Sequence, residues 1–291
     1  MIAVAGVTGH TGGATASALL DAHRPVRVIV RDRARGDAWA ARGAEVAVAS
    51  LDDAAGLTEA LRGTSAAYLL VPPIYQAPDL FAAQRAIVHA MAEAMARSGV
   101  GHVVFLSSIG GHLAYGTGPV RLLHEAEAAL AATGRPLTVL RSSYLLENWA
   151  AVLGAVAAQG VLPSFIPLDQ RMEMNGTADV GHEAARLLLG PPPASRRTVE
   201  MGGPRPTTPR EIAAALSSLR GSEVTPVLVP LEQVVPTFAS FGIPESTGRL
   251  LEEMYAAVAS GYLAYEDPAA PHVRGRLTAA DVLGPMLARS S

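Results

Sequence analysis

The chain has 291 residues, 23 basic and 26 acidic side chains and a formal charge of −3, and 49% of its residues are hydrophobic. This length and composition predict one large or two modest globular domains, and the near-neutral charge argues against nucleic acid as the main partner. The sequence contains no cysteine and no lysine, which excludes disulfides, thiolate metal sites, a P-loop lysine and a Tyr-x-x-x-Lys catalytic pair.

Several further absences concern location and metals. Met1 leads directly into an apolar stretch without a basic segment, and no uninterrupted apolar run reaches the ~18 residues that a membrane span needs. The histidines lack the spacing of metal ligands. We therefore expect a cytoplasmic protein that takes no metal, does not contact membrane and acts as a monomer or homodimer on a small-molecule substrate.

Short apolar runs alternate with helix-like segments through the first half of the chain. Runs typical of strands lie at residues 1–5, 26–30, 45–48, 66–71, 103–106 and 138–140. Segments typical of helices lie at residues 11–22, 34–42, 54–61, 80–98 and 119–132. This alternation predicts an α/β fold with a doubly wound parallel sheet and helices on both faces.

The pattern loosens after about residue 149, where proline becomes frequent. Helices are predicted at residues 208–220 and 245–260, and Thr208 with Glu211 has the spacing of a capping box. The three prolines at 191–193 are typical of a surface connection or of a rigid loop within one domain. We expect a first domain at residues 1–149, with later returns near 177–203, and a smaller domain formed mostly by residues 150–291.

A glycine-rich turn, GVTGHTG, occupies residues 6–12 between the first strand and the first helix. Glycines there permit a tight turn, a close approach of the backbone to a pyrophosphate, and close packing of helix on strand. The helix N-terminus offers unpaired N–H groups to phosphates. The turn therefore predicts a dinucleotide-binding site, with an ordinary glycine-rich connection as the alternative.

The end of the second predicted strand indicates which dinucleotide binds. Arg31 lies 19 residues after Gly12, where NAD enzymes usually carry an acid. A guanidinium suits a 2′-phosphate, so NADP(H) is the preferred cofactor. Asp32 follows and leaves NAD(H) open, and a purely solvated role for Arg31 and Arg33 is the other alternative.

These residues resemble the NmrA-like group of atypical short-chain dehydrogenase/reductases, which includes quinone-reductase-like and isoflavone-reductase-like members. The resemblance continues through the segments FLSS at 105–108, HEAE at 124–127, YLLEN at 144–148, TADVG at 177–181 and GGP at 202–204. It covers nearly the whole chain, although the last ~80 residues match loosely. It implies a Rossmann domain that binds NADP(H) and a smaller C-terminal domain over the nicotinamide.

The resemblance also implies positions for the cofactor and the chemistry. Cofactor contacts are implied for residues along the carboxyl edge of the sheet, namely Gly6, Thr8, Gly9, His10, Thr11, Gly12, Arg31, Leu70, Val71, Pro72, Ser107 and Asn148. Hydride transfer needs little from the protein beyond geometry and weak polarisation of the acceptor. Ser108, His124 and Tyr144 are the candidate catalytic residues.

Two further features leave alternatives open. His124 and Glu127 are three residues apart on a predicted helix, so they share a face and interact there, or they form a surface pair without a catalytic role. Tyr115 lies in a glycine-rich loop that is either a substrate lid or a mobile surface loop. Tyr75 and Gln76 are placed near the pocket mouth, and late aromatics such as Phe238, Phe241 and Tyr255 are interpreted mainly as core.

Three functions remain in competition at this point. The first is an NADPH-dependent oxidoreductase that transfers hydride to a quinone-like or other conjugated small molecule. The second is a non-catalytic NADP(H) sensor that acts through a protein partner, which the missing Tyr-x-x-x-Lys pair favours. The third is a secondary-metabolite tailoring enzyme, such as an epimerase, cyclase or reductase, because fold alone does not fix the reaction.

Overall fold

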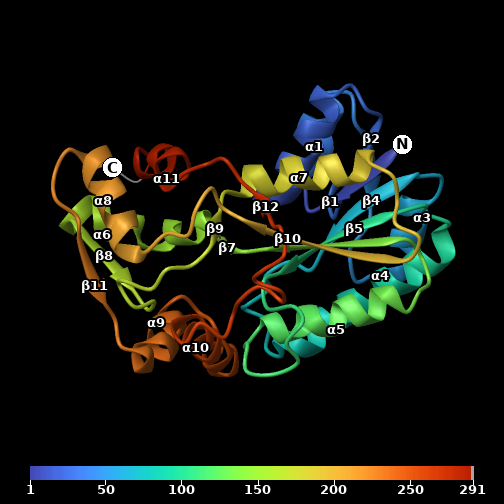
Figure 1. Cartoon of the computed structure of the whole chain (residues 1–291). Helices are drawn as coiled ribbons and strands as arrows, with labels where there is room; N and C mark the ends of the chain where they lie inside the picture. The colour runs from blue at the N-terminus through green and yellow to red at the C-terminus, as the bar shows by residue number, and fades with distance from the viewer. Residues whose placement is uncertain (290–291) are drawn as a thin grey trace.

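In the computed structural model, which describes residues 1–289, eight strands form one parallel sheet in the order β12-β10-β6-β5-β4-β1-β2-β3 (Figure 1). The strands are β1 (Ile2–Ala5), β2 (Val26–Val30), β3 (Glu45–Val48), β4 (Ala66–Leu70), β5 (Val103–Ser108), β6 (Leu137–Ser142), β10 (Arg196–Gly202) and β12 (Val273–Arg274). The predicted doubly wound parallel sheet is confirmed, and each of the six predicted strands is present. β10 and β12 join it from the second half of the chain.

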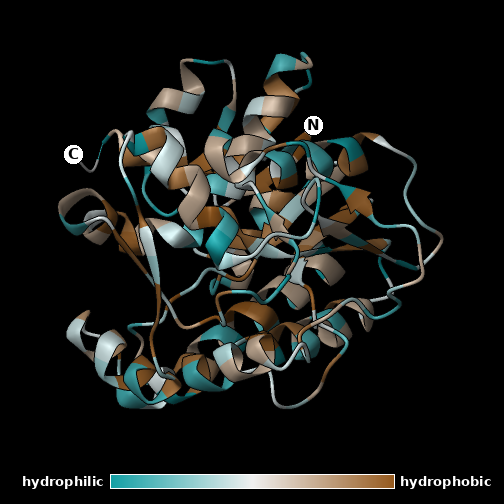
Figure 2. Cartoon of the chain, turned by 60° about the vertical axis from the view of Figure 1, so that its left-hand side comes forward, coloured by the Kyte–Doolittle hydropathy of each residue, from teal (hydrophilic) through white to brown (hydrophobic). Residues whose placement is uncertain are grey.

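Helices cover both faces of this sheet. On one face α1 (His10–Asp21) packs against α7 (Thr177–Leu189), and on the other α4 (Leu80–Ser98) packs between α3 (Ala54–Leu61) and α5 (Val120–Ala131) (Figure 1). All four residues of β1 are buried, as expected for a strand covered on two faces. Figure 2 shows that the strands are largely hydrophobic. Two apolar cores therefore lie above and below the sheet.

The helix predicted at residues 34–42 differs in the structure. A 3₁₀ turn, η1 (Arg33–Gly36), runs into the short helix α2 (Asp37–Ala40). A Cβ at Gly36 would lie 2.5 Å from Cγ1 of Val46 on β3, so glycine lets the chain approach the strand closely. The side chain of Asp32 accepts a hydrogen bond from the Ala34 amide and begins the turn there. Local capping and this close contact replace one regular helix.

The second half of the chain builds a third apolar core. Its strands pair in two small parallel sheets, β7 (Tyr144–Leu145) with β9 (Met174–Asn175) and β8 (Val161–Ser164) with β11 (Thr225–Leu228). Its helical elements are η2 (Leu146–Val152), α6 (Leu153–Gln159), α8 (Pro209–Arg220), η3 (Leu231–Gln233), α9 (Val234–Ser240), α10 (Glu245–Ala259) and α11 (Ala279–Leu287). The predicted capping box of α8 is present, because Thr208 and Glu211 exchange hydrogen bonds. Leu146, Ile212 and Leu283 are among the buried residues of this core.

Two segments return from the second half to the main sheet. Pro191 and Pro192 are exposed in the connection between α7 and β10, so they lie within the sheet-and-helix unit on the surface. β10 pairs with β6 along six residues, and β12 pairs with β10 at the sheet edge. The division near residue 149 stays a prediction. Within residues 1–289, no helix has both the length and the apolar character of a membrane span.

Candidate active site

The glycine turn lies at the carboxyl end of β1. Gly6 has a φ of +68°, and a Cβ there would lie 2.6 Å from Cδ2 of Leu70, which ends β4. A Cβ at Gly12 would overlap the carbonyl oxygens of Ala5 and Gly6. Gly6 therefore supplies the backbone conformation and Gly12 the close packing of α1 on β1. The expected glycine roles have a direct structural cause at these two positions.

The first turn of α1 offers backbone donors at this edge. Thr8, Gly9 and His10 are exposed, whereas Thr11 and Gly12 are buried. The first intrahelical donor is the Gly13 amide, which binds the Gly9 carbonyl at 3.1 Å, so the preceding amides of α1 have no partner within the helix. The first turn contains no acidic residue. This is the arrangement of an anion site, and it fits a pyrophosphate.

Arg31 lies at the same edge, one strand away. β1 and β2 are parallel neighbours with Ala5 opposite Ile29, so Gly6 and Arg31 both follow the carboxyl ends of their strands. Arg31, Arg33 and Arg35 are exposed and form no ion pair with any residue in 1–289. The Asp32 carboxylate, in contrast, caps η1 through the Ala34 amide at 3.0 Å. The side chains without an ion-pair partner at this edge are therefore positively charged, which suits the binding of a 2′-phosphate better than the binding of two ribose hydroxyls.

The opposite part of the same edge lies at β4, β5 and β6. Leu70 ends β4, Val71 packs against the apolar core, and the Pro72 carbonyl accepts a hydrogen bond from Nε2 of Gln84. In the pairing of β5 with β6, Ser107 lies opposite Arg141 and Ser108 opposite Ser142. Tyr144 follows two residues later. The predicted nicotinamide-side residues are therefore gathered at one edge by the parallel register of three strands.

The two serines are not equivalent. Ser107 is buried, and its hydroxyl donates to Oε1 of Glu127 at 2.6 Å. Ser108 is half-buried, and no hydrogen bond of its side chain is present in the described part of the chain. Adjacent strand residues point to opposite faces, so only one of the pair can face a given side of the sheet. Ser108 is the serine available to a ligand, and contact of Ser107 with the cofactor stays a prediction.

Tyr144 and Asn148 lie together at the start of the second half. Burial, the neighbouring Tyr255 and then Tyr75 raise the pKa of the Tyr144 phenol well above its ordinary value, and a hydrogen bond from exposed Asn148 opposes this rise. Burial also raises the pKa of Tyr255 to about 12. Both phenols are therefore protonated at neutral pH, and because they hydrogen-bond each other, only one of their two protons is free for another acceptor. Tyr144 also packs on Trp149 with ring centroids 6.3 Å apart.

An aromatic cleft opens between the segment after β4 and the turn that joins α9 to α10. It has a volume of about 550 Å³ and is lined by residues 73–77 together with Phe241 and Ile243. Tyr255 of α10 packs on Phe165 and Phe238 with ring centroids 5.2 and 6.3 Å apart. Tyr75 and Gln76 thus lie at the cleft, as expected. Phe241 is 58% exposed at this cleft, so it is one of the late aromatics that lie at a pocket and not in the core.

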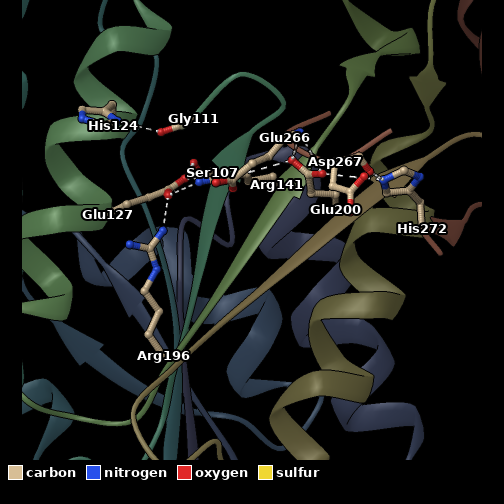
Figure 3. Close-up of polar contacts among 10 residues, drawn as sticks. All are labelled: Ser107, Gly111, His124, Glu127, Arg141, Arg196, Glu200, Glu266, Asp267 and His272. Carbon is tan, nitrogen blue, oxygen red and sulfur yellow. Dashed lines mark hydrogen bonds and ion pairs between the residues drawn. The ribbon is translucent and has the colours of Figure 1, made fainter. Parts of the chain in front are cut away.

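The predicted pairing of His124 with Glu127 is wrong. Nδ1 of His124 lies 3.1 Å from the Gly111 carbonyl oxygen, while the Glu127 carboxylate binds residues of three strands (Figure 3). Because the carbonyl accepts, Nδ1 carries the proton, and Nε2 of the neutral ring has none to donate. This geometry weakens His124 as a hydrogen-bond donor to substrate. The helical spacing was correct, but stronger partners for Glu127 come from β5, β6 and β10.

Glu127 is the inner member of a polar network that the sequence did not reveal. Its carboxylate binds Nε and Nη2 of Arg141 at 3.0 and 2.7 Å and Nη2 of Arg196 at 2.6 Å. Nη1 of Arg141 binds Glu266 at 2.5 Å and Glu200 at 3.5 Å (Figure 3). The side chains of Glu127 and Arg141 are each 2% exposed. The carboxylates that pair with Arg141 offset the free-energy cost of burying its guanidinium.

The glycine-rich loop after β5 packs against the end of the second half. A Cβ at Gly118 would overlap the carbonyl oxygen of Leu250 on α10, and one at Gly110 would overlap the Leu263 side chain. Both glycines have positive φ, +56° and +80°. Tyr115 at the loop tip is 76% exposed. A lid role for Tyr115 stays a prediction, whereas the glycines serve close contact between the two halves.

Comparisons with known proteins agree with this geometry. The profile of the NmrA-like family matches residues 1–276. The chain is 28% identical over 280 residues to NAD(P)H azoreductase of Xenophilus azovorans, covering 95% of this chain and 93% of the relative. It is 27% identical over 269 residues to quinone oxidoreductase 2 of Escherichia coli strain K12, covering 90% of each. The crystal structure of the NADPH-dependent quinone oxidoreductase of Escherichia coli with NADPH superposes with a TM-score of 0.77 at 23% identity, covering 99% of this chain and 95% of that one.

Proposed function

The chain belongs to the NmrA-like family, and from this premise we propose that it is an NADPH-dependent oxidoreductase that transfers hydride to a quinone-like or other conjugated small molecule. Two relatives that align over at least 90% of the chain are named for reduction of azo compounds and quinones with nicotinamide cofactors. The observation that carries the proposal is one continuous sheet edge. Free helix amides and Arg31 follow β1 and β2, and the aromatic cleft follows β4, the neighbouring strand on the other side of β1.

The residues present fit NADP(H). Gly6 has a positive φ, and a Cβ at Gly12 would overlap the backbone. Because these positions carry no side chain, a pyrophosphate can approach the backbone of residues 6–12 closely. The amides of the first turn of α1 would hold the phosphates, and Arg31 would hold the 2′-phosphate. When bound, NADPH supplies the hydride that the acceptor takes up.

The protein then contributes positioning and polarisation on the β4 side of the edge. Phe241 lines the cleft and packs on Phe238, which packs on Tyr255, and this aromatic cluster suits a flat conjugated acceptor. Tyr144 and Tyr255 hydrogen-bond each other, and this pair of phenols would donate its remaining proton in a hydrogen bond to the acceptor oxygen or nitrogen that gains negative charge. Ser108 is the second candidate donor at the end of β5. Neither role needs the absent Tyr-x-x-x-Lys pair.

Turnover tests the proposal directly. Purified protein mixed with NADPH and a panel of quinones and azo dyes should consume NADPH, which is followed by its absorbance. Tight NADPH binding without oxidation by any acceptor would contradict the reductase proposal. That outcome, together with unequal affinities for NADPH and NADP⁺ and a captured protein partner, would favour the sensor function.

The Arg31→Ala variant should weaken NADPH binding by about tenfold to a hundredfold, because one charge-assisted phosphate contact contributes about 1.5–3 kcal/mol. NADH lacks the 2′-phosphate, so its affinity should change little. Calorimetric titration of both cofactors measures the difference. Arg24→Ala is the matched control, since Arg24 is also exposed but precedes β2 and so lies at the opposite sheet edge. Equal losses for both cofactors in Arg31→Ala would refute the assignment of the 2′-phosphate.

A further inference from the structure

Residues 260–272 form a strap that carries the chain from α10 back to the main sheet. The strap has no regular secondary structure and ends at β12 (Figure 1). It begins where the chain packs on the glycine-rich loop, through Leu263 against Gly110 and Tyr262 against Gly116. The helix before it bears Tyr255, which packs on Phe238, and Phe238 in turn packs on Phe241 of the cleft. The position of the strap therefore affects where α10 lies relative to the end of β5.

One residue of the strap is tethered to the sheet at two points. The Glu266 carboxylate binds Nη1 of buried Arg141 on β6 at 2.5 Å, and the Glu266 amide donates to both carboxylate oxygens of Glu200 on β10 at 3.1 Å (Figure 3). The hydrogen bond and charge of Arg141 hold the pKa of the Glu266 carboxyl below its usual range, which indicates a favourable ion pair. The tether thus crosses two neighbouring strands.

A second contact closes the strap on itself. Nε2 of His272 lies 3.1 Å from the Asp267 carbonyl oxygen and 3.7 Å from the Glu200 carboxylate. The His272 ring stacks on Tyr265 with centroids 3.7 Å apart and an interplanar angle of 16°. Glu200 therefore accepts hydrogen bonds from the main-chain amide of Glu266 and also lies close to the ring of His272. The contacts with β6 and β10 therefore hold the strap in one defined position on the sheet.

The tether is separable from the stability of the sheet. Arg141 keeps both contacts to Glu127 when Glu266 is removed, because those contacts use Nε and Nη2. Glu266 itself is 57% exposed, so its loss leaves no buried carboxylate. If Glu266 contributed only to stability, its removal would therefore change the protein little. If Glu266 positions the strap, its removal would change the cleft.

We propose that Glu266 is a positioning residue for the acceptor site: by binding Arg141 it fixes the strap and so holds α10, whose Tyr255 supports Phe241 of the cleft through Phe238, at its working distance from the end of β5. The inference rests on the proposed function for its kinetic readout. It assigns no contact between Glu266 and substrate or cofactor.

The Glu266→Gln variant tests the tether, because it keeps the side-chain length and removes the charge. With menadione as acceptor and saturating NADPH, we expect the KM for menadione to rise about tenfold, equivalent to about 1.4 kcal/mol, with kcat changed far less. The Kd of NADPH should stay within about twofold. Hydrogen exchange of residues 260–272 should accelerate. Glu245→Gln is the matched control, since it breaks an exposed ion pair with Arg249 on the same helix.

Two results would overturn the tether. Unchanged menadione KM with unchanged exchange in the strap would show that Glu266 positions nothing, and an equal weakening of NADPH would show a general disturbance of the site. If the unmodified protein fails to oxidise NADPH with menadione, the proposed function fails separately. Hydrogen exchange then decides the tether, with faster exchange in Glu266→Gln supporting it and identical exchange refuting it.

Discussion

Replacing Gly9 with leucine should abolish cofactor binding while the fold survives. Gly9 caps α1 with a φ of −103°, which any L residue adopts, and a Cβ there would meet only the Gly6 carbonyl oxygen at 3.4 Å. The added side chain would occupy the exposed space in front of the first-turn amides, which is the proposed phosphate site. Losing two charge-assisted contacts costs about 3–6 kcal/mol, so NADPH affinity should fall at least about a hundredfold.

Calorimetry with NADPH measures the loss, and circular dichroism with a thermal scan verifies the fold. Gly154→Leu is the matched control, because Gly154 is an exposed helical glycine on α6 with no atom within 4 Å of its Cβ position. Undiminished NADPH binding by a folded Gly9→Leu protein would contradict the phosphate site. Gly12 is unsuitable for this test, since a Cβ there would overlap the backbone and disturb the fold itself.

The Glu127→Ala variant should lose about 3–5 kcal/mol of unfolding free energy, the cost of removing one partner of a buried ion pair. Arg141, 2% exposed, would lose both contacts to Glu127, and Ser107 would lose its acceptor. The remaining carboxylates, Glu200 and Glu266, both contact the far side of the guanidinium, through Nη1. The inner side of the buried Arg141 guanidinium would therefore face the vacated space without an anionic partner.

Urea denaturation measures this loss as a shift of the midpoint at constant slope. Glu59→Ala provides the control, because Glu59 and Arg62 form an ion pair whose side chains are 68% and 62% exposed. Exposed pairs contribute about 0–1 kcal/mol. If Glu127→Ala and Glu59→Ala destabilise the protein equally, the buried network is not the support that its geometry indicates.

The sheet and the glycine turn at its carboxyl edge were predictable because their signals are local. A parallel strand covered on both faces is a short apolar run, and the turn at residues 6–12 combines glycine spacing with a strand before it and a helix after it. Helix ends also followed local chemistry, as Asp79 caps α4 and Gly99 ends it with a φ of +77°. Such features need no knowledge of distant contacts.

The polar network and the aromatic cleft depend on contacts that the sequence does not encode locally. Glu127 and Arg196 are 69 residues apart, and Arg141 and Glu266 are 125 apart, so no spacing rule connects them. A late aromatic such as Phe241 reads as core although it lines the cleft, because burial and cleft lining use the same residue types. The helical spacing of His124 and Glu127 could not show that β5 and β6 bind the carboxylate more strongly.

The path of the chain has a consequence for how the protein can be divided. β6 has its outer hydrogen-bonding partner in β10, and β10 has its own in β12, which begins only at residue 273. In a fragment ending at residue 149, β6 would be an exposed sheet edge that tends to pair with other chains. The fragment would also lack Glu200 and Glu266, which bind Arg141. The nucleotide-binding part therefore cannot be excised as a free-standing module; evolution or engineering must exchange the two halves together.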